Sequence, residues 1–250
     1  MRRRFFVDRF ERDSATLHSE AAEHLGRVLR AEPGQFYELS DGERVWLARV
    51  ERVALSKRGD NRIEFALVEP IAAEAPALRI QLLVAIVKFD RFEWCLEKAT
   101  ELGVDEVVPL ATTRSDKPLI AAAEKRHDRW NRILLESAQQ SRRLRPPFLR
   151  AALRSVDAFS TSTASTKIFL SENREAQVLR DLIPARGANR QEGTAAVSVA
   201  VGPEGGWTPK EIDAAVTNGY LEASLGGNIL RTETAVIASL AVVQFALGAP

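Results

Sequence analysis

The sequence predicts an α/β domain with a mostly parallel sheet, preceded by a smaller domain rich in β-strands. Two observations support this architecture. From residue 78 onward, continuous apolar runs alternate with segments of helical periodicity, which is typical of strands covered by helices on both faces. Before residue 72, short strand-like segments are separated by turns. With 250 residues, 45% of them hydrophobic, the chain can bury one large core, or a medium core and a small one.

The first region, 1–72, is expected to form a small barrel with one helix. The segments FFV, QFYELSDGERVWLARVERV and NRIEFALVEP are rich in β-branched and aromatic residues, and Pro-Gly and Asp-Gly dipeptides at 33 and 41 mark turns. Residues 18–30 predict the helix. Its apolar face comprises Ala22, Leu25, Val28 and Leu29. The segment AAEAPA, 72–77, is a predicted linker.

The second region, 73–250, opens with RIQLLVAIV, a predicted buried strand. Asp90 and Glu93 predict a capping box at the start of a helix, and Gly103 predicts its end. The strand VDEVVPL follows. The buried face of the helix is expected to comprise Phe92, Cys95, Leu96, Ala99 and Leu102.

The remaining segments continue the alternation of helix and strand. We expect a long helix over 122–141, the strand TKIFL over 166–170, a short helix before Pro184 and the strand AVSVAV over 196–201. The segment Thr208-Pro-Lys-Glu211 opens another helix, with proline at its first position. The apolar run AVIASLAVVQFAL predicts a buried helix at the end.

The charge balance does not by itself indicate a partner, because the formal net charge is only +1. The distribution of arginines is more informative. One cluster comprises Arg2, Arg3, Arg4, Arg9 and Arg12, and a second comprises Arg142, Arg143, Arg145, Arg150 and Arg154. Local basic clusters in a neutral protein suggest an anionic partner, and solvated surface charge is the alternative.

Several classes of protein are not expected. Cys95 is the only cysteine, and the three histidines lack metal-ligand spacing, so we predict no disulfide and no metal site. The basic N-terminus is not followed by an apolar segment typical of a signal peptide. The run at 235–247 is shorter than the ~18 residues of a membrane span. We therefore expect a soluble, cytoplasmic protein without a membrane partner.

Two glycine loops are candidate walls of a binding site. In AVSVAVGPEGGW, Gly202, Gly205 and Gly206 follow a predicted buried strand, where ligands bind in open α/β sheets. Their spacing fits neither a dinucleotide fingerprint nor a phosphate loop, which favours an adenosine without phosphates. The alternative is a tight turn with glycine for steric reasons. LGGNILRTETA, about twenty residues later, could form the opposite wall.

Across its whole length, the chain resembles the ribosomal RNA small subunit methyltransferase E family, which belongs to the SPOUT class. The N-terminal RRRFFV, EHLGRVLR and ELSDG are similar to the start of that family. The more specific motifs are KATELGVDEVVPL, Arg114-Ser115, ESAQQSRRLRPP, GPEGGW and LGGNILRTETA. One departure is Gln139, which stands where the family has glutamate.

The resemblance implies a function and a fold that the spacing alone does not. The family uses S-adenosylmethionine to methylate N3 of a specific uridine in 16S rRNA. It implies a PUA-like RNA-binding β-barrel over 1–72 and a SPOUT methyltransferase domain over 73–250. The latter carries a deep trefoil knot over about 166–240. It also implies a homodimer with each active site close to the subunit interface, and a substrate in the small ribosomal subunit or a late assembly intermediate.

The resemblance also implies site residues. The cofactor contacts are Leu170, Ser171 and Glu172 in a first loop, Val201, Gly202, Pro203, Gly205 and Gly206 in a second, and Leu225, Gly226, Ile229, Leu230 and Thr232 in a third. The RNA contacts are Arg2, Arg3, Arg4, Arg9, His24, Arg30, Arg114, Arg142 and Arg143.

Arg231 and Glu233 are the predicted catalytic residues. Uridine N3 must lose a proton before it can attack a methyl group, and a cation beside the uracil oxygens would stabilise the anion. Arg231 is permanently charged and can donate to two oxygens at once. Glu233 could accept a proton or orient Arg231, and the alternative is a helix N-terminal charge interaction. The general base is not identified.

Two other functions are compatible with the sequence. One is SPOUT methylation at another rRNA or tRNA position, including a ribose 2′-hydroxyl. The other is a non-catalytic RNA-binding protein whose glycine loops are structural.

Overall fold

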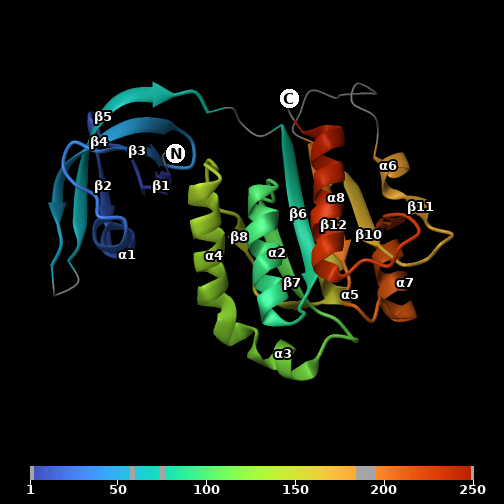
Figure 1. Ribbon diagram of the computed structural model, residues 1–250. Helices are drawn as coiled ribbons and strands as arrows, with labels where there is room; N and C mark the ends of the chain where they lie inside the picture. The colour runs from blue at the N-terminus through green and yellow to red at the C-terminus, as the bar shows by residue number, and fades with distance from the viewer. Residues whose placement is uncertain (1–2, 57–59, 74–76, 184–194, 249–250) are drawn as a thin grey trace. The chain divides into compact units, whose positions relative to one another are not determined.

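The computed structural model describes residues 3–56, 60–73, 77–183 and 195–248 (Figure 1). The chain divides into two compact units. The first comprises residues 1–75 and 138–146, and the second comprises 76–137 and 147–250. Residues 138–146 thus belong with the N-terminal unit although they are distant in sequence. The domain boundary at 72 stays a prediction.

The first unit contains a five-stranded mixed sheet in the order β1-β3-β4-β5-β2. Its β1–β3 pair is parallel, whereas the other pairs are antiparallel. Phe5, Leu17, Leu39 and Phe65 pack together in its core. The strands are β1 (Arg4–Phe6), β2 (Ser14–His18), β3 (Phe36–Ser40), β4 (Val45–Ala54) and β5 (Arg62–Ile71). The sequence analysis did not predict β2.

The predicted helix at 18–30 is shorter and less regular than expected. Helix α1 (Ser19–Glu23) continues into a π-helical turn, η1 (His24–Val28), and His18 ends strand β2. Leu25 is buried as predicted, but Val28 is 65% exposed. A π-turn rotates the following side chains relative to an α-helix, because its hydrogen bonds span five residues. The placement of Val28 on the buried face is therefore wrong.

The second unit is an eight-stranded sheet in which all paired strands are parallel, as the buried apolar runs predicted. The strand order is β11-β13-β10-β12-β6-β7-β8, and β9 also pairs with β7. The strands are β6 (Leu78–Ala85), β7 (Glu106–Ala111), β8 (Phe148–Leu149), β9 (Leu153–Arg154), β10 (Thr166–Leu170), β11 (Gln177–Val178), β12 (Ala195–Val201) and β13 (Leu221–Ser224).

Helices cover both faces of this sheet. Leu82 and Val84 of β6 pack in a core with α2 and α8, while Leu83 packs in a second core with α5 and α7. Figure 1 shows α2 and α8 side by side in front of the sheet. The helices are α2 (Phe89–Glu101), α3 (Lys117–Ala122), α4 (His127–Gln140), α5 (Ser155–Ala158), α6 (Leu179–Leu182), α7 (Pro209–Thr217) and α8 (Thr232–Leu247), with short 3₁₀ turns η2 (Glu124–Arg126) and η3 (Phe159–Thr161).

Two predictions about helix starts are wrong, and one is confirmed. Helix α2 begins at Phe89 without a side-chain cap, because its N-cap residue is Lys88 and Asp90 lies inside the helix. The Glu93 carboxylate binds Arg129 at 2.7 Å. The helix predicted over 122–141 begins only at His127, after α3 and η2. Helix α7 begins as predicted, with Thr208 and Glu211 forming a complete capping box.

The linker predicted at 72–77 lies partly outside the described residues, which omit 74–76. No helix in the described ranges combines the length and the apolar character that crossing a bilayer would require.

Candidate functional site

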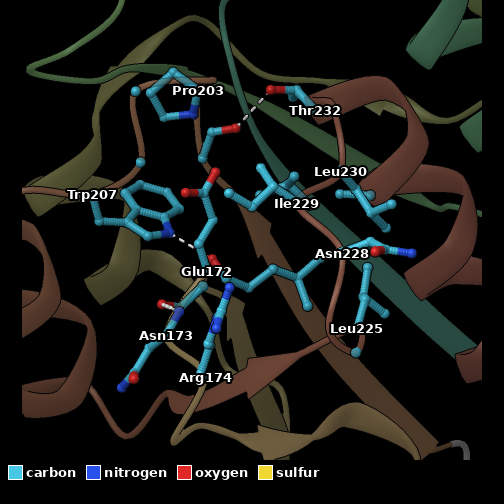
Figure 2. A pocket seen from close by; sticks show the side chains of 18 of the residues that line it. Glu172, Asn173, Arg174, Pro203, Trp207, Leu225, Asn228, Ile229, Leu230 and Thr232 are labelled. Carbon is cyan, nitrogen blue, oxygen red and sulfur yellow. Dashed lines mark hydrogen bonds between the residues drawn. The ribbon is translucent and has the colours of Figure 1, made fainter.

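A cavity of about 300 Å³ lies at the carboxyl ends of β10, β12 and β13 (Figure 2). All of the residues predicted as cofactor contacts line it, so the structure brings the three predicted loops together. The cavity has further lining residues that the sequence analysis did not place there as cofactor contacts. These are Arg114, Asn173, Arg174, Trp207, Ile212, Gly227, Asn228 and Ala235.

Two hydrogen bonds between side chain and backbone join the three loops. Trp207 Nε1 donates to the carbonyl oxygen of Leu170 at 2.7 Å, which links the second loop to the end of β10. Thr232 Oγ1 donates to the carbonyl oxygen of Gly202 at 2.9 Å, which links the first residue of α8 to the end of β12. Figure 2 shows both bonds as dashed lines beside the cavity. The loops therefore form one continuous wall.

Glycine is required at this wall for two different physical reasons. Gly206 and Gly226 have φ values of +69° and +113°, a region that other L-residues rarely adopt. At Gly202 the reason is space, because an added Cβ would lie 2.9 Å from Cε2 of Trp207. The Trp207 ring can thus lie against the backbone only because residue 202 has no side chain.

Glu211 connects the glycine loop to two other segments. Its buried carboxylate accepts hydrogen bonds from Ser155 Oγ at 2.6 Å, from the Thr113 backbone N–H at 2.9 Å, and from both Thr208 donors at 2.7 and 2.9 Å. Burial raises the pKa of Glu211, but these hydrogen bonds outweigh it and hold the pKa below its ordinary value. The charged carboxylate therefore positions the loop that carries Arg114.

The capping box of α7 accounts only for the local contact between Glu211 and Thr208. The partners Thr113 and Ser155 are remote in sequence, and no spacing rule could have identified them. A glutamate in a capping box gives no signal that its second oxygen binds another loop.

The predicted catalytic residues lie at the start of α8, and their surroundings differ. Arg231 is exposed and lies between two lining residues, Leu230 and Thr232. The side chain of Glu233 is only 14% exposed, and its Oε1 lies 3.8 Å from Nε of Arg91 on α2. Glu233 Oε2 is buried and has no hydrogen-bond partner in the described part of the chain. Orientation of Arg231 by Glu233 stays a prediction.

Cys95 of α2 is buried, and the Glu233 carboxylate is close enough to affect the pKa of its thiol. Burial raises the pKa of the Cys95 thiol to about 12, and the carboxylates of Glu233 and Glu204 add to the rise. The thiol therefore remains protonated at neutral pH, and Cys95 acts as a small core residue and not as a nucleophile.

The predicted RNA contacts fall into several environments. Arg2 lies outside the described residues. Arg3, Arg9 and Arg30 are exposed, and Arg143 is half-buried. Arg114 is exposed as well and lines the cavity. His24 lies in the π-helical turn, with its Nε2 buried and without a partner among the described residues.

Arg4 and Arg142 are held by a carboxylate in the first unit. Arg4 binds Glu38 at 2.9 Å and also donates to the carbonyl oxygen of Arg142 at 2.6 Å. Arg142 lies 3.5 Å from Glu38 on the other carboxylate oxygen. Because the side chain of Arg4 is only 11% exposed, a structural role competes with phosphate binding at this residue.

Comparisons with known proteins identify relatives over most of the chain. The family described as RNA methyltransferase domain matches residues 73–244. The ribosomal RNA small subunit methyltransferase E of Synechocystis sp. is 32% identical over 92% of this chain and 73% of its own length. That of Aquifex aeolicus is 28% identical, over 87% and 89%. The crystal structure of this enzyme from Neisseria gonorrhoeae, bound to S-adenosyl methionine, is 30% identical with a TM-score of 0.80, covering 99% of both chains.

Proposed function

Because the chain belongs to the ribosomal RNA small subunit methyltransferase E family, we propose that it transfers the methyl group of S-adenosylmethionine to N3 of a specific uridine in 16S rRNA. The observation that carries this proposal is the cavity into which the loops after β10, β12 and β13 converge. We further propose that the reaction takes place in the cytoplasm, on the small ribosomal subunit or a late assembly intermediate.

The cavity suits an adenosine ligand. Leu170, Val201 and Leu230 provide apolar wall for an adenine ring, and the glycines expose backbone amides and carbonyls for its hydrogen bonds. Thr232 and Trp207 use their donors on the backbone, which fixes the shape of the wall. When bound, S-adenosylmethionine would supply an electrophilic methyl group on a sulfonium.

Arg231 is the proposed catalytic residue. It is exposed, permanently charged, and bracketed in sequence by two residues of the cavity wall. A guanidinium there would bind the uracil oxygens and stabilise the negative charge that develops as N3 loses its proton. Glu233 would help to hold the start of α8 beside the glycine loop. Its Oε1 lies 3.8 Å from Nε of Arg91, and Arg91 also binds Glu204 of that loop at 3.0 Å.

Nucleoside analysis tests the proposed reaction. The purified protein is incubated with labelled S-adenosylmethionine and either small ribosomal subunits or deproteinised 16S rRNA, and the RNA is then digested. We expect N3-methyluridine as the labelled product. A 2′-O-methyl nucleoside, or label in a tRNA control instead, would support methylation of another position. Saturable cofactor binding by calorimetry excludes the non-catalytic alternative, which predicts none.

We propose that the first unit binds RNA through its exposed arginines. Replacing Arg3 and Arg9 by Ala should weaken RNA binding and flatten its salt dependence, because fewer counterions are released. The slope of log affinity against log salt is negative, and each lost phosphate contact should reduce its magnitude by about 0.7–0.9.

The matched control is Arg180→Ala, which removes an arginine of the second unit that is 78% exposed and paired with Asp181. An unchanged slope in the Arg3 and Arg9 variant would show that these arginines are only solvated. An equal loss in the control would show a nonspecific charge effect.

We also propose that two copies of the chain associate through α8. Phe245 is 90% exposed, and Ile237 and Ala241 precede it at helical spacing on a side of α8 that is not fully buried. Phe245→Asp should therefore convert a dimer into a monomer by light scattering, without lowering the helix content. Phe148→Asp is the control, since Phe148 is 64% exposed on a different element. A monomeric parent protein would contradict the proposal.

The knot over about 166–240 and the closure of the first unit into a PUA-like barrel are also proposals. Three segments of the proposed knot range meet at one cavity, namely 170–174, 201–207 and 225–232. The mixed sheet of the first unit supplies the strands that such a barrel needs.

A further inference from the structure

In the part of the chain that the structure describes, three charged residues line the cavity. Arg114 lies in the loop after β7, and Glu172 and Arg174 lie in the loop after β10. S-adenosylmethionine consists of an uncharged adenosine, a sulfonium, and an amino-acid end with a carboxylate and an ammonium group. A carboxylate removed from water requires a charged partner, so one of the two arginines is expected to bind it.

Arg114 is held in place before any ligand binds. Its Nη1 donates to the carbonyl oxygen of Gly205 at 2.5 Å. Its aliphatic stem lies against Gly205, where an added Cβ would be 3.3 Å from Cβ and 3.4 Å from Cδ of Arg114. A guanidinium has five N–H donors, so this one bond leaves others for a ligand.

The loop that carries Arg114 is fixed as well. Thr112 and Ser115, both buried, share a hydrogen bond of 2.8 Å, and the Thr113 N–H donates to Glu211. Arg114 and Arg174 are both exposed, but in the described part of the chain no hydrogen bond or ion pair holds the side chain of Arg174. Ordering a long free side chain costs conformational entropy, whereas an anchored one has already lost much of its freedom.

We propose that Arg114 binds the carboxylate of the amino-acid end of S-adenosylmethionine, and that Gly205 lacks a side chain so that Arg114 can lie across the loop. This inference rests on the proposed function. It assigns the amino-acid end of the ligand to the part of the cavity that Arg114 lines.

Calorimetry with two ligands tests the proposal, using S-adenosylmethionine and its decarboxylated analogue, which retains the ammonium and sulfonium groups. Arg114→Met keeps an aliphatic stem against Gly205 but removes the charge. We expect this variant to bind S-adenosylmethionine about 10- to 100-fold more weakly, the usual effect of losing a charge-assisted hydrogen bond, and to bind the analogue as the parent protein does. Arg114→Lys should recover part of the affinity for S-adenosylmethionine alone.

The other outcomes overturn the proposal in distinguishable ways. Equal weakening of both ligands would show that Arg114 only positions the glycine loop. Unchanged binding of both, with weaker RNA binding, would make Arg114 an RNA contact. If Arg174→Met, and not Arg114→Met, weakens binding of S-adenosylmethionine but not of the analogue, Arg174 is the residue that binds the carboxylate. If the parent protein binds neither ligand, the proposed function itself fails.

Discussion

Replacement of Arg231 by Ala is expected to lower the rate of methyl transfer by about 10²–10³, or about 2.7–4 kcal/mol in activation free energy. The charge on the uracil develops only as N3 is deprotonated and attacked, so Arg231 would act mainly in the transition state. Because Arg231 is exposed and precedes α8, its truncation removes no core contact, and the fold should persist. Cofactor and RNA affinities should change far less than the rate.

Single-turnover methylation of rRNA across a pH series measures this effect. Arg231→Lys should recover the rate only in part, because an ammonium cannot donate to two oxygens in the fixed geometry of a guanidinium. Raising the pH should narrow the defect of the Ala variant, because uridine that is already ionised needs less stabilisation. Arg180→Ala is the control for removal of one exposed arginine. Normal turnover by Arg231→Ala with saturating RNA would mean that the catalytic centre lies elsewhere.

Replacement of Glu211 by Ala is expected to destabilise the protein by about 1–3 kcal/mol. The substitution leaves the buried Ser155 hydroxyl without its acceptor, and it also removes the acceptor of the partly buried bonds from the Thr113 and Thr208 N–H groups. Each buried donor left unsatisfied costs about 1–3 kcal/mol. Denaturant unfolding measures the loss. Glu97→Gln, at a half-exposed surface ion pair, should change the stability by less than about 0.5 kcal/mol.

The same residue predicts a dependence on pH. Since the folded protein holds the pKa of Glu211 below its ordinary value of 4.5, the charged carboxylate adds stability that is fully present above that value. This contribution is lost as the pH falls from about 4.5 through the lower pKa of the folded state. Glu211→Gln cannot titrate, so its stability deficit relative to the parent protein should shrink over that window. A constant deficit would mean that the carboxylate is not the source of the effect.

Elements with a strong and uninterrupted pattern were predictable from the sequence. The strand TKIFL matches β10 residue for residue, and AVSVAV matches β12 to within one residue. Both are apolar runs buried within a parallel sheet, where nearly every side chain must be hydrophobic. The start of α7 was predictable because its cap is made by Thr208 and Glu211, which are three residues apart.

Elements that depend on distant partners were not predictable. Glu93 has the spacing of a capping box with Asp90, yet it binds Arg129 on another helix. The apolar periodicity of 18–30 fits an α-helix, but a π-helical turn changes which side chains face the core. In both segments a tertiary interaction or backbone irregularity overrides a local preference.

By itself, the sequence determined that a parallel α/β unit carries two glycine loops as candidate walls of one site, and the family resemblance supplied the individual cofactor contacts. Gly206 and Gly226 are needed for local backbone angles, so their positions are visible as a motif. Only the tertiary structure decided that Arg114 lies on the cavity and that Glu233 pairs with Arg91. These contacts join segments far apart in the chain. Their geometry depends on how the strands and helices pack, and sequence spacing carries no record of it.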